Sequence, residues 1–375
     1  MERTIAATVM AHSHAEAHRV GRRLLMVRCT RARAPGKLVL LGEYAVLTPG
    51  EPGVVMAVDR YAEVIVTPSQ DGMVWSDEEG VTHRWWLEDA VHFAAGRRFP
   101  RFVGGALSVV LAYLADLGIE LSPFRLDIVT RSLSGPTGKY GLGSSAAVVV
   151  AVVGGVLAAA LPAERPIKRD VVFELALGAH RQVQGGGSGI DVAASVYGGF
   201  LQYRAGVAES ARRPETVVVP IKPAMPLPIL AGDSGQSIQT NPRVLAFQDW
   251  SAAHHRFHHE FLELSRVNVS ALIEDWRSGE GLGIARIARG RDLLEGLGSR
   301  LGLSMETPRL ARMNALAKRW GGAAKPSGSG GGDVGVALLP TVQARDAVAR
   351  AWEEAGIRVL DVAKSEAGLS VYPAG

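Results

Sequence analysis

The chain has one cysteine in 375 residues, and it has no apolar run of membrane-spanning length. Cys29 cannot form a disulfide within the chain, which is typical of proteins from a reducing cytoplasm. The most apolar stretch, residues 146–161, is shorter than the roughly 20 residues that span a bilayer. Residues 1–33 also lack the order of basic, apolar and small residues that a secretory signal peptide has. These absences predict a cytoplasmic protein with no membrane partner.

Outside its N-terminus the chain has almost no excess of charge. The formal net charge is +4, but residues 1–33 hold seven arginines against two glutamates, so the rest is close to neutral. A nucleic-acid-binding protein needs a clustered basic face on its folded part. We therefore predict no nucleic-acid partner, and we interpret residues 1–31 as a poorly ordered extension.

Glycine, in contrast, is abundant and gathers in loops. In Lys139–Ala147 (KYGLGSSAA), two glycines and two serines come directly before an apolar run that reads as a buried helix. Glycine permits close backbone approach, a serine can cap a helix, and free N–H groups at a helix start bind phosphate. The stretch matches neither a Walker A loop nor the dinucleotide fingerprint. Taken alone, it is more simply explained as an ordinary capped turn.

Two further loops strengthen the phosphate interpretation. Residues 34–38 (APGKL) place Lys37 at the start of a strand, and Gly42-Glu43-Tyr44 follows. Residues 325–333 (KPSGSGGGD) carry more glycine than a turn requires, and such a density of backbone donors suits an anionic group. Three separated glycine loops with nearby lysines predict a phosphorylated ligand.

The pattern of apolar residues predicts the α+β class. The opening, residues 34–67, is rich in β-forming residues, and helical periods follow at 101–118, 146–161, 169–184, 242–277, 280–302 and 308–320. The Pro- and Arg-rich segment 205–228 marks a passage between two lobes. We expect an N-terminal lobe at 32–220 and a C-terminal lobe at 221–375.

The stretches APGKLVLLGEYAVL, GPTGKYGLGSSAA and KPSGSGGGD resemble, in order, the three signature motifs of the GHMP kinases. The resemblance spans about residues 32–370. It implies a ribosomal protein S5 domain 2-like N-terminal lobe and a ferredoxin-like C-terminal lobe. It also implies that the chain uses ATP with Mg²⁺ to phosphorylate a small molecule, as a monomer or homodimer.

Within the family, KYGLGSSAAV and GSGIDVAASVYGG look most like the phosphomevalonate kinase branch, which implies phosphomevalonate as the acceptor. Mevalonate kinase and other GHMP small-molecule kinases are the alternatives among enzymes. A catalytically silent relative that binds nucleotide also stays open.

The resemblance implies roles for individual residues. The catalytic residues would be Asp191, Lys37 and Lys139, and Ser145 would contact the metal ion. The ATP-binding residues would be Pro136, Gly141, Leu142, Gly143, Ser144, Ser145 and Ala146. The acceptor-binding residues would be Lys37, Glu43, Tyr44, Ser188, Gly189, Ser237, Ser327 and Gly328. Without the motif context, each has an ordinary explanation as a solvated lysine, a cap or a turn residue.

Histidines offer a weaker case for metal binding. The run His254–His259 (HHRFHH) contains i,i+4 pairs that can chelate zinc on a helix, but the sequence offers no clear third ligand. We interpret it as a polar helix face. His180 lies eleven residues before Asp191, where mevalonate kinases carry a Mg²⁺-binding glutamate. Because histidine is a poor ligand for Mg²⁺, we interpret His180 as a helix-face residue.

Overall fold

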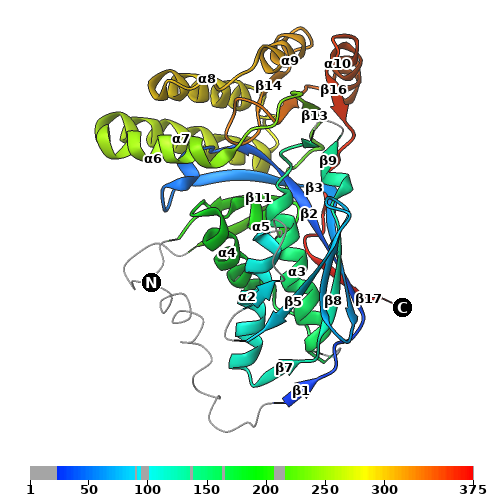
Figure 1. The fold of residues 1–375 in the computed structure, drawn as a ribbon. Coiled ribbons are helices and arrows are strands. Elements are labelled where there is room, and N and C mark those ends of the chain that lie inside the picture. Colours follow the sequence, from blue (N-terminus) through cyan, green and yellow to red (C-terminus); the bar gives the residue numbers. More distant parts are fainter. Residues whose placement is uncertain are drawn as a thin grey trace.

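The computed structural model describes residues 23–88, 91–93, 101–135, 138–162, 165–206 and 216–374. Two lobes stand one above the other in Figure 1, and the long strands β2 and β3 run from one into the other. The lower lobe has a large sheet with helices packed against it, and the upper lobe has a smaller sheet with its own helices. This mixture of helices and mainly antiparallel strands confirms the predicted α+β class.

The large sheet is built around one long hairpin. Its strands are β12 (Val217–Ile221), β11 (Phe200–Arg204), β3 (Pro52–Pro68), β8 (Phe124–Val129), β4 (Gly72–Ser76), β5 (Thr82–Leu87) and β6 (Val91–Phe93) in spatial order, with β2 (Thr30–Leu41) on β3 and β17 (Ser370–Pro373) on β2. Around it lie η1 (Ala45–Leu47), α2 (Arg101–Asp116), β7 (Ile119–Leu121), η2 (Arg131–Leu133), β9 (Ser134–Gly135), β10 (Gly138–Lys139), α3 (Ser144–Ala160), α4 (Arg169–Gln184) and α5 (Ile190–Tyr197). Strands β2 and β3 pair along nearly their whole length, with bulges near Gly36 and Leu41.

Helix α3 forms the centre of the lower core. Every residue from Ala146 to Ala160 is buried, which is expected for a helix that is apolar on all sides. The helix packs against β2, β3, α2 and α4. Because residues 146–160 are enclosed, the first turn is held firmly where it emerges beside β2.

The upper lobe has the predicted ferredoxin-like strand order. It contains β13 (Ile229–Asp233), α6 (Thr240–Ala253), α7 (His255–Ser278), α8 (Ile284–Leu301), α9 (Pro308–Lys318), β14 (Ala323–Pro326), β15 (Val334–Leu338), α10 (Val342–Glu354) and β16 (Arg358–Leu360). The antiparallel sheet runs β14-β15-β13-β16, which places the first strand of the lobe between the third and the fourth. Met313, Val348 and Trp352 fill the core between this sheet and helices α9 and α10.

The described ends of the chain differ from the expected lobe boundaries. Residues 23–25, assigned from the sequence to the N-terminal extension, form strand β1 and pair in parallel with β7. Residues 26–31 of that extension lead into and begin β2, and residues 1–22 lie outside the described residues. At the other end, β17 leaves the upper lobe and pairs with β2. The last strand therefore belongs to the lower sheet. Strand β2 pairs with β3 along one edge, and β17 occupies its other edge.

The helix predicted over residues 242–277 is two helices. His254 has φ −129° and ψ 52°, which breaks the helical path between α6 and α7. The sequence has neither glycine nor proline at this point, so the interruption carries no local signal.

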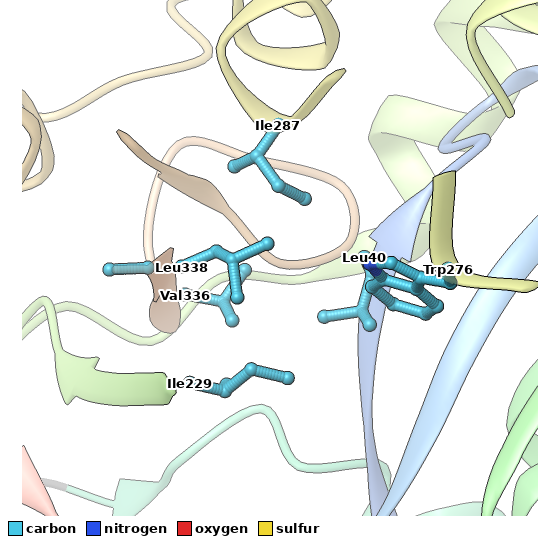
Figure 2. Close-up of a pocket in the computed structure, with 7 residues that line it drawn as sticks. Leu40, Ile229, Trp276, Ile287, Val336 and Leu338 are labelled. Atoms are coloured by element: carbon cyan, nitrogen blue, oxygen red, sulfur yellow. The ribbon is translucent and has the colours of Figure 1, made fainter. Parts of the chain in front are cut away.

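Apolar contacts join the two lobes. Leu40 of β2 and Trp276 of α7 face Ile287 of α8 and the strand pair β13–β15 across a small pocket lined only by apolar side chains (Figure 2). Such a lining suits a packed joint between lobes and does not suit a phosphorylated ligand. Within the described ranges, no helix combines the length and the apolar character that crossing a bilayer demands.

Candidate active site

The start of α3 is open to an anion. Gly143 is the N-cap residue with φ 77°, and no described side chain caps the helix. The expected serine cap is therefore absent, because Ser144 and Ser145 lie inside the first turn. The first backbone bond of the helix joins Ala147 N–H to the Gly143 carbonyl, at 3.1 Å. The preceding N–H groups and the positive end of the helix dipole are thus available to phosphate.

Lys37 holds the loop that leads into α3. Its backbone N–H donates to the Leu142 carbonyl at 2.8 Å, and its Nζ donates to the Gly141 carbonyl at 2.9 Å. A Cβ added to Gly143 would lie 2.9 Å from Lys37 Cγ, so only glycine leaves room for the lysine stem. Strand β2 thus fixes both the loop and a cation beside it.

Carboxylates surround this cation. Burial lowers the pKa of Lys37 below that of an ordinary lysine, and the charges of Asp191, Asp333 and Glu43 oppose the change. Lys37 therefore lies at the point where the Gly141–Gly143 loop, the expected phosphate loop, and acidic groups from both lobes meet.

Asp333 is a member of the site to which the sequence assigned no role. It has φ 55° although it is not glycine, and its carboxylate accepts from Ile238 N–H at 3.1 Å. A Cβ on Gly141 would collide with the Asp333 side chain. Burial raises the pKa of Asp333, while the Ile238 N–H, Lys37 and the Ser237 hydroxyl oppose that shift. Asp333 thus links the phosphate loop to the segment that contains Ser237.

Three consecutive helices bring the side chains of a second polar cluster together. Ser145 lies in the first turn of α3, His180 near the end of α4, and Asp191 in the first turn of α5. His180 Nε2 is 3.1 Å from Ser145 Oγ and 3.8 Å from Asp191 Oδ2. His180 was interpreted as a helix-face residue, and at 3% exposure it lies on a buried face, in contact with two predicted site residues.

The third glycine loop is tied to the first motif. The Ser327 hydroxyl accepts from Val39 N–H at 2.9 Å, and the Tyr44 hydroxyl donates to the Ser329 carbonyl at 2.6 Å. Burial raises the pKa of Tyr44, whose ring packs against Phe247. Ser327 and Tyr44, predicted to contact the acceptor, are therefore engaged in joining the loop to β2 and η1.

Glu43 also has an internal partner. It forms a buried ion pair with Lys325, whose Nζ also donates to the Pro326 carbonyl at 2.7 Å. Side-chain exposure is 4% for Glu43 and 0% for Lys325. The sequence predicted Glu43 as an acceptor contact, whereas the structure uses it to neutralise a buried lysine beneath the loop.

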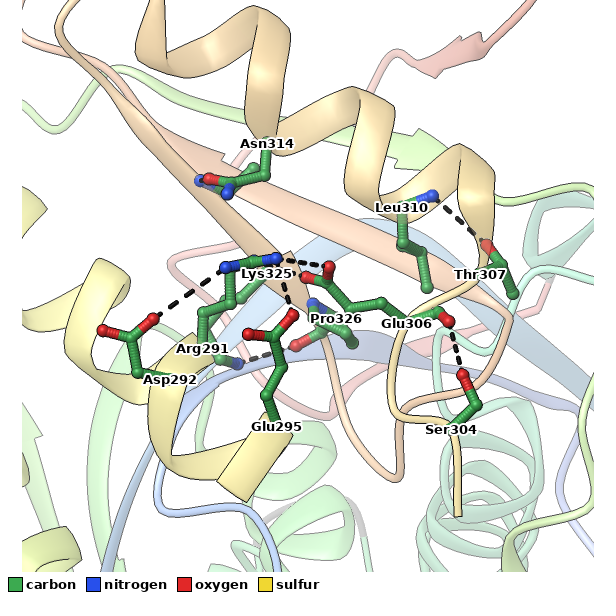
Figure 3. Close-up of polar contacts among 11 residues, drawn as sticks. Arg291, Asp292, Glu295, Ser304, Glu306, Thr307, Leu310, Asn314, Lys325 and Pro326 are labelled. Atoms are coloured by element: carbon green, nitrogen blue, oxygen red, sulfur yellow. Dashed lines mark hydrogen bonds and ion pairs between the residues drawn. The ribbon is translucent and has the colours of Figure 1, made fainter. Parts of the chain in front are cut away.

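A polar network in the upper lobe supports the same loop (Figure 3). Arg291 of α8 forms two hydrogen bonds to Glu306, at 2.6 and 2.7 Å, and one to Glu295, at 2.6 Å. The neighbouring Met305 carbonyl accepts from Gly331 N–H at 2.7 Å. The segment before α9 is therefore anchored on one side by Arg291 and holds the glycine loop on the other.

The remaining predicted residues fall into two groups. Ser188 and Gly189 directly precede α5, where Gly189 is the N-cap residue with φ 88°, and Gly328 lies beside Lys37 Nζ. Lys139, in contrast, is half-exposed on the β9–β10 hairpin and pairs with Glu78 at 3.2 Å. Pro136 lies outside the described residues.

The histidine run has no metal-binding arrangement. His254, His255 and His259 are exposed at the junction of α6 and α7. His258 lies 3.3 Å from the Thr48 hydroxyl and packs edge-on against Phe247, and burial lowers its pKa. Among the described residues, no group of three or more His, Cys, Asp or Glu side chains is placed to hold a metal ion.

Comparison with known proteins agrees with this geometry. The profile of the GHMP kinases N terminal domain matches residues 102–199, and that of the GHMP kinases C terminal region matches 286–358. The phosphomevalonate kinase of Streptomyces sp. (strain CL190) is 34% identical over 371 residues, which cover 90% of this chain and 97% of the relative. The mevalonate kinase of Thermococcus onnurineus (strain NA1) is 30% identical over 340 residues, which cover 85% and 91%.

A solved structure shows the same fold. Streptococcus pneumoniae phosphomevalonate kinase in complex with phosphomevalonate and AMPPNP aligns with a TM-score of 0.75 and 24% identity, covering 89% of this chain and 99% of that one. One conclusion follows from the glycine loops, from the uncapped start of α3 and from relatives that align over most of the chain. The chain belongs to the GHMP kinase family and is an ATP-dependent kinase.

Proposed function

We propose that the chain is a phosphomevalonate kinase of the mevalonate route to isoprenoids. It transfers the γ-phosphoryl group of ATP to the phosphate of (R)-5-phosphomevalonate, giving 5-diphosphomevalonate and ADP. The observation that carries the proposal is the position of Lys37, which binds the Gly141 carbonyl and lies beside Gly328 and the acidic groups. One cation there can attract two phosphate groups at once. The 34% identity to the Streptomyces phosphomevalonate kinase supports this acceptor.

The reaction needs positioning more than a strong base. The acceptor phosphate is largely ionised near neutral pH, so its oxygen can attack the γ-phosphorus without first losing a proton to the protein. A new P–O bond forms as the bond to the β-phosphate oxygen breaks, and the charge passes to ADP. The N–H groups at the start of α3 and the Lys37 ammonium stabilise that charge. Asp191 orients Lys37 or the acceptor.

The donor set fits magnesium. Mg²⁺ prefers hard oxygen ligands and in kinases uses one or two protein groups together with nucleotide phosphates. The Ser145 hydroxyl supplies such an oxygen in the first turn of α3, next to the N–H groups that would receive the nucleotide phosphates. When bound there, Mg²⁺ neutralises charge on the transferring phosphates.

Mevalonate kinase is the second candidate, because relatives of that name are 30% identical over most of the chain. Its acceptor is an alcohol, which must lose a proton during transfer. In that case Asp191 would be required as a base.

An acceptor panel separates these functions. ADP release is measured with phosphomevalonate, mevalonate, homoserine and galactose, and ³¹P NMR identifies the product. We expect phosphomevalonate to give the highest kcat/KM and the paired phosphorus signals of a diphosphate. Faster turnover of mevalonate would assign the second function. Nucleotide binding without consumption of any acceptor would indicate a silent relative.

Location and assembly stay predictions. The lone Cys29 accords with the cytoplasm. Gel filtration with light scattering distinguishes the two expected assemblies, a monomer and a homodimer.

A further inference from the structure

His180 has an unusual place in the site. Its ring stacks on Phe102, with centroids 5.1 Å apart and planes at 26°, and the residue is 3% exposed. The stack covers one face of the imidazole, while Nε2 faces Ser145 Oγ at 3.1 Å and Asp191 Oδ2 at 3.8 Å. One buried nitrogen therefore lies between a hydroxyl at the start of α3 and a carboxylate at the start of α5.

The arrangement differs from a Ser-His-Asp hydrolase triad. In that triad the carboxylate binds the ring nitrogen opposite the serine, so that the imidazole can take the serine proton during attack. Here Ser145 and Asp191 approach the same nitrogen, and the carboxylate is beyond hydrogen-bond distance. The geometry therefore gives no means of activating Ser145 as a nucleophile.

The same geometry suits a different task. A serine hydroxyl has one hydrogen and two lone pairs. When Ser145 donates its hydrogen to His180 Nε2, both lone pairs of its oxygen remain for a cation. Rotation of the hydroxyl is then restricted, and its oxygen stays at a constant distance from the Asp191 carboxylate.

We propose that His180 is a positioning residue that fixes Ser145 relative to Asp191, and so fixes the magnesium–nucleotide contact relative to the acidic group of the acceptor site. The inference rests on the proposed kinase site. It differs from a role in packing alone, because packing needs the ring of His180 but not its Nε2 atom.

Two matched variants separate the roles. The side-chain amide of His180→Gln can reach the place of Nε2, and its oxygen can accept from Ser145, whereas His180→Asn is too short. Both replace an aromatic ring by an amide and lose the stack on Phe102. A third variant, Phe102→Leu, removes the stack but keeps the imidazole.

Nucleotide affinity is measured by calorimetry with and without Mg²⁺, alongside kcat, both KM values and the melting temperature. For His180→Asn we expect the gain in ADP affinity that Mg²⁺ produces to fall by roughly 10- to 100-fold, together with kcat. His180→Gln should keep most of both. Phe102→Leu should lower the melting temperature and leave the Mg²⁺ dependence near wild type.

Equal behaviour of His180→Gln and His180→Asn at the same melting temperature would overturn the proposal. A loss of Mg²⁺ dependence in Phe102→Leu as large as that in His180→Asn would also overturn it. If the wild type phosphorylates no mevalonate-type acceptor, the proposed function fails. The calorimetric comparison still decides the role of His180, since it needs only nucleotide and metal.

Discussion

The Lys37 ammonium donates a hydrogen bond of 2.9 Å to the Gly141 carbonyl. A residue of β2 thereby holds the phosphate loop from one side while the buried helix α3 holds it from the other. The cation and the loop cannot be displaced independently, so changes at either one should appear in both nucleotide binding and catalysis.

Gly143→Ala should disrupt this contact. The new methyl group would lie 2.9 Å from Lys37 Cγ, in a backbone with φ 77°. Overpacking of this kind costs about 1–3 kcal/mol, so we expect ATP affinity to fall by roughly 10- to 100-fold. Gly302→Ala is the control, because φ there is 65° and a methyl group would meet nothing within 4 Å. It should lose some stability and keep its ATP affinity; equal ATP affinities in the two variants would contradict the expectation.

The pH profile should report the charge of Lys37. Burial lowers its pKa below 10.5, so the charged form is lost, as pH rises, earlier than in an ordinary lysine. Asp333 is one of the carboxylates that raise this pKa. Asp333→Asn should therefore move the alkaline fall of kcat/KM to lower pH. In Lys37→Arg the fall should vanish, because guanidinium does not titrate in that range. If kcat/KM falls at the same alkaline pH in both variants as in the wild type, the titration of Lys37 does not cause that fall.

Asp191→Ala should reduce turnover more than nucleotide binding. We expect kcat to fall by roughly 10²- to 10³-fold, which is the usual loss when an enzyme loses one preorganised polar group that stabilises the transition state. The KM for ATP should stay nearly unchanged. Asp170→Ala is a matched control, since Asp170 also occupies the first turn of a helix but binds the Tyr197 hydroxyl at 2.7 Å. Steady-state kinetics of both variants provide the check. Equal kcat values would remove Asp191 from the mechanism.

Lys139 should act on the acceptor by long-range attraction. It is half-exposed and shares its charge with Glu78, so one unit of charge is worth about 1 kcal/mol or less there. We expect Lys139→Ala to raise the KM for phosphomevalonate by a few-fold at low salt. Glu78→Gln, which frees the lysine, should lower it. If neither variant changes that KM, Lys139 has no part in acceptor binding.

Arg291→Met should destabilise the upper lobe. It leaves Glu306, with only 8% of its side chain exposed, without its guanidinium partner. Breaking such a pair costs about 2–3 kcal/mol at this degree of burial. Asp292→Asn alters a neighbouring contact of 3.8 Å on an exposed side chain and should change stability little. Urea unfolding of both variants measures the difference, and similar midpoints would show that the network contributes little.

The conformation of the loop at Gly141–Gly143 and the burial of α3 were predictable because their physical signals are local. Gly141 and Gly143 take positive φ angles, and the apolar run behind them is buried on all sides. Lys37 and the third loop could be recognised for the same reason, as short motifs with a fixed order. The identity of the helix cap was not predictable, since glycine and serine are both common at that position.

Contacts between segments that lie far apart in the sequence could not be predicted from local sequence signals. Glu43 and Lys325 are 282 residues apart, and nothing in the local sequence of either shows that the two neutralise each other. His180 gave no hint of burial, because its neighbours in α4 include charged residues. Asp333 belongs to a recognised motif, yet its role depends on Ile238 and Gly141, which only the fold brings to it.

The pairing of β17 with β2 has a mechanical consequence. The chain leaves the large sheet after β12 and returns to it at β17, so the upper lobe is inserted between two attachment points on the lower one. A rigid rotation of the upper lobe relative to the lower lobe must bend both connections. The axis of such a rotation must therefore pass near the two connections. Cleavage of one connection would release this restraint, while the buried Glu43–Lys325 pair and the apolar joint around Leu40 would still hold the lobes together.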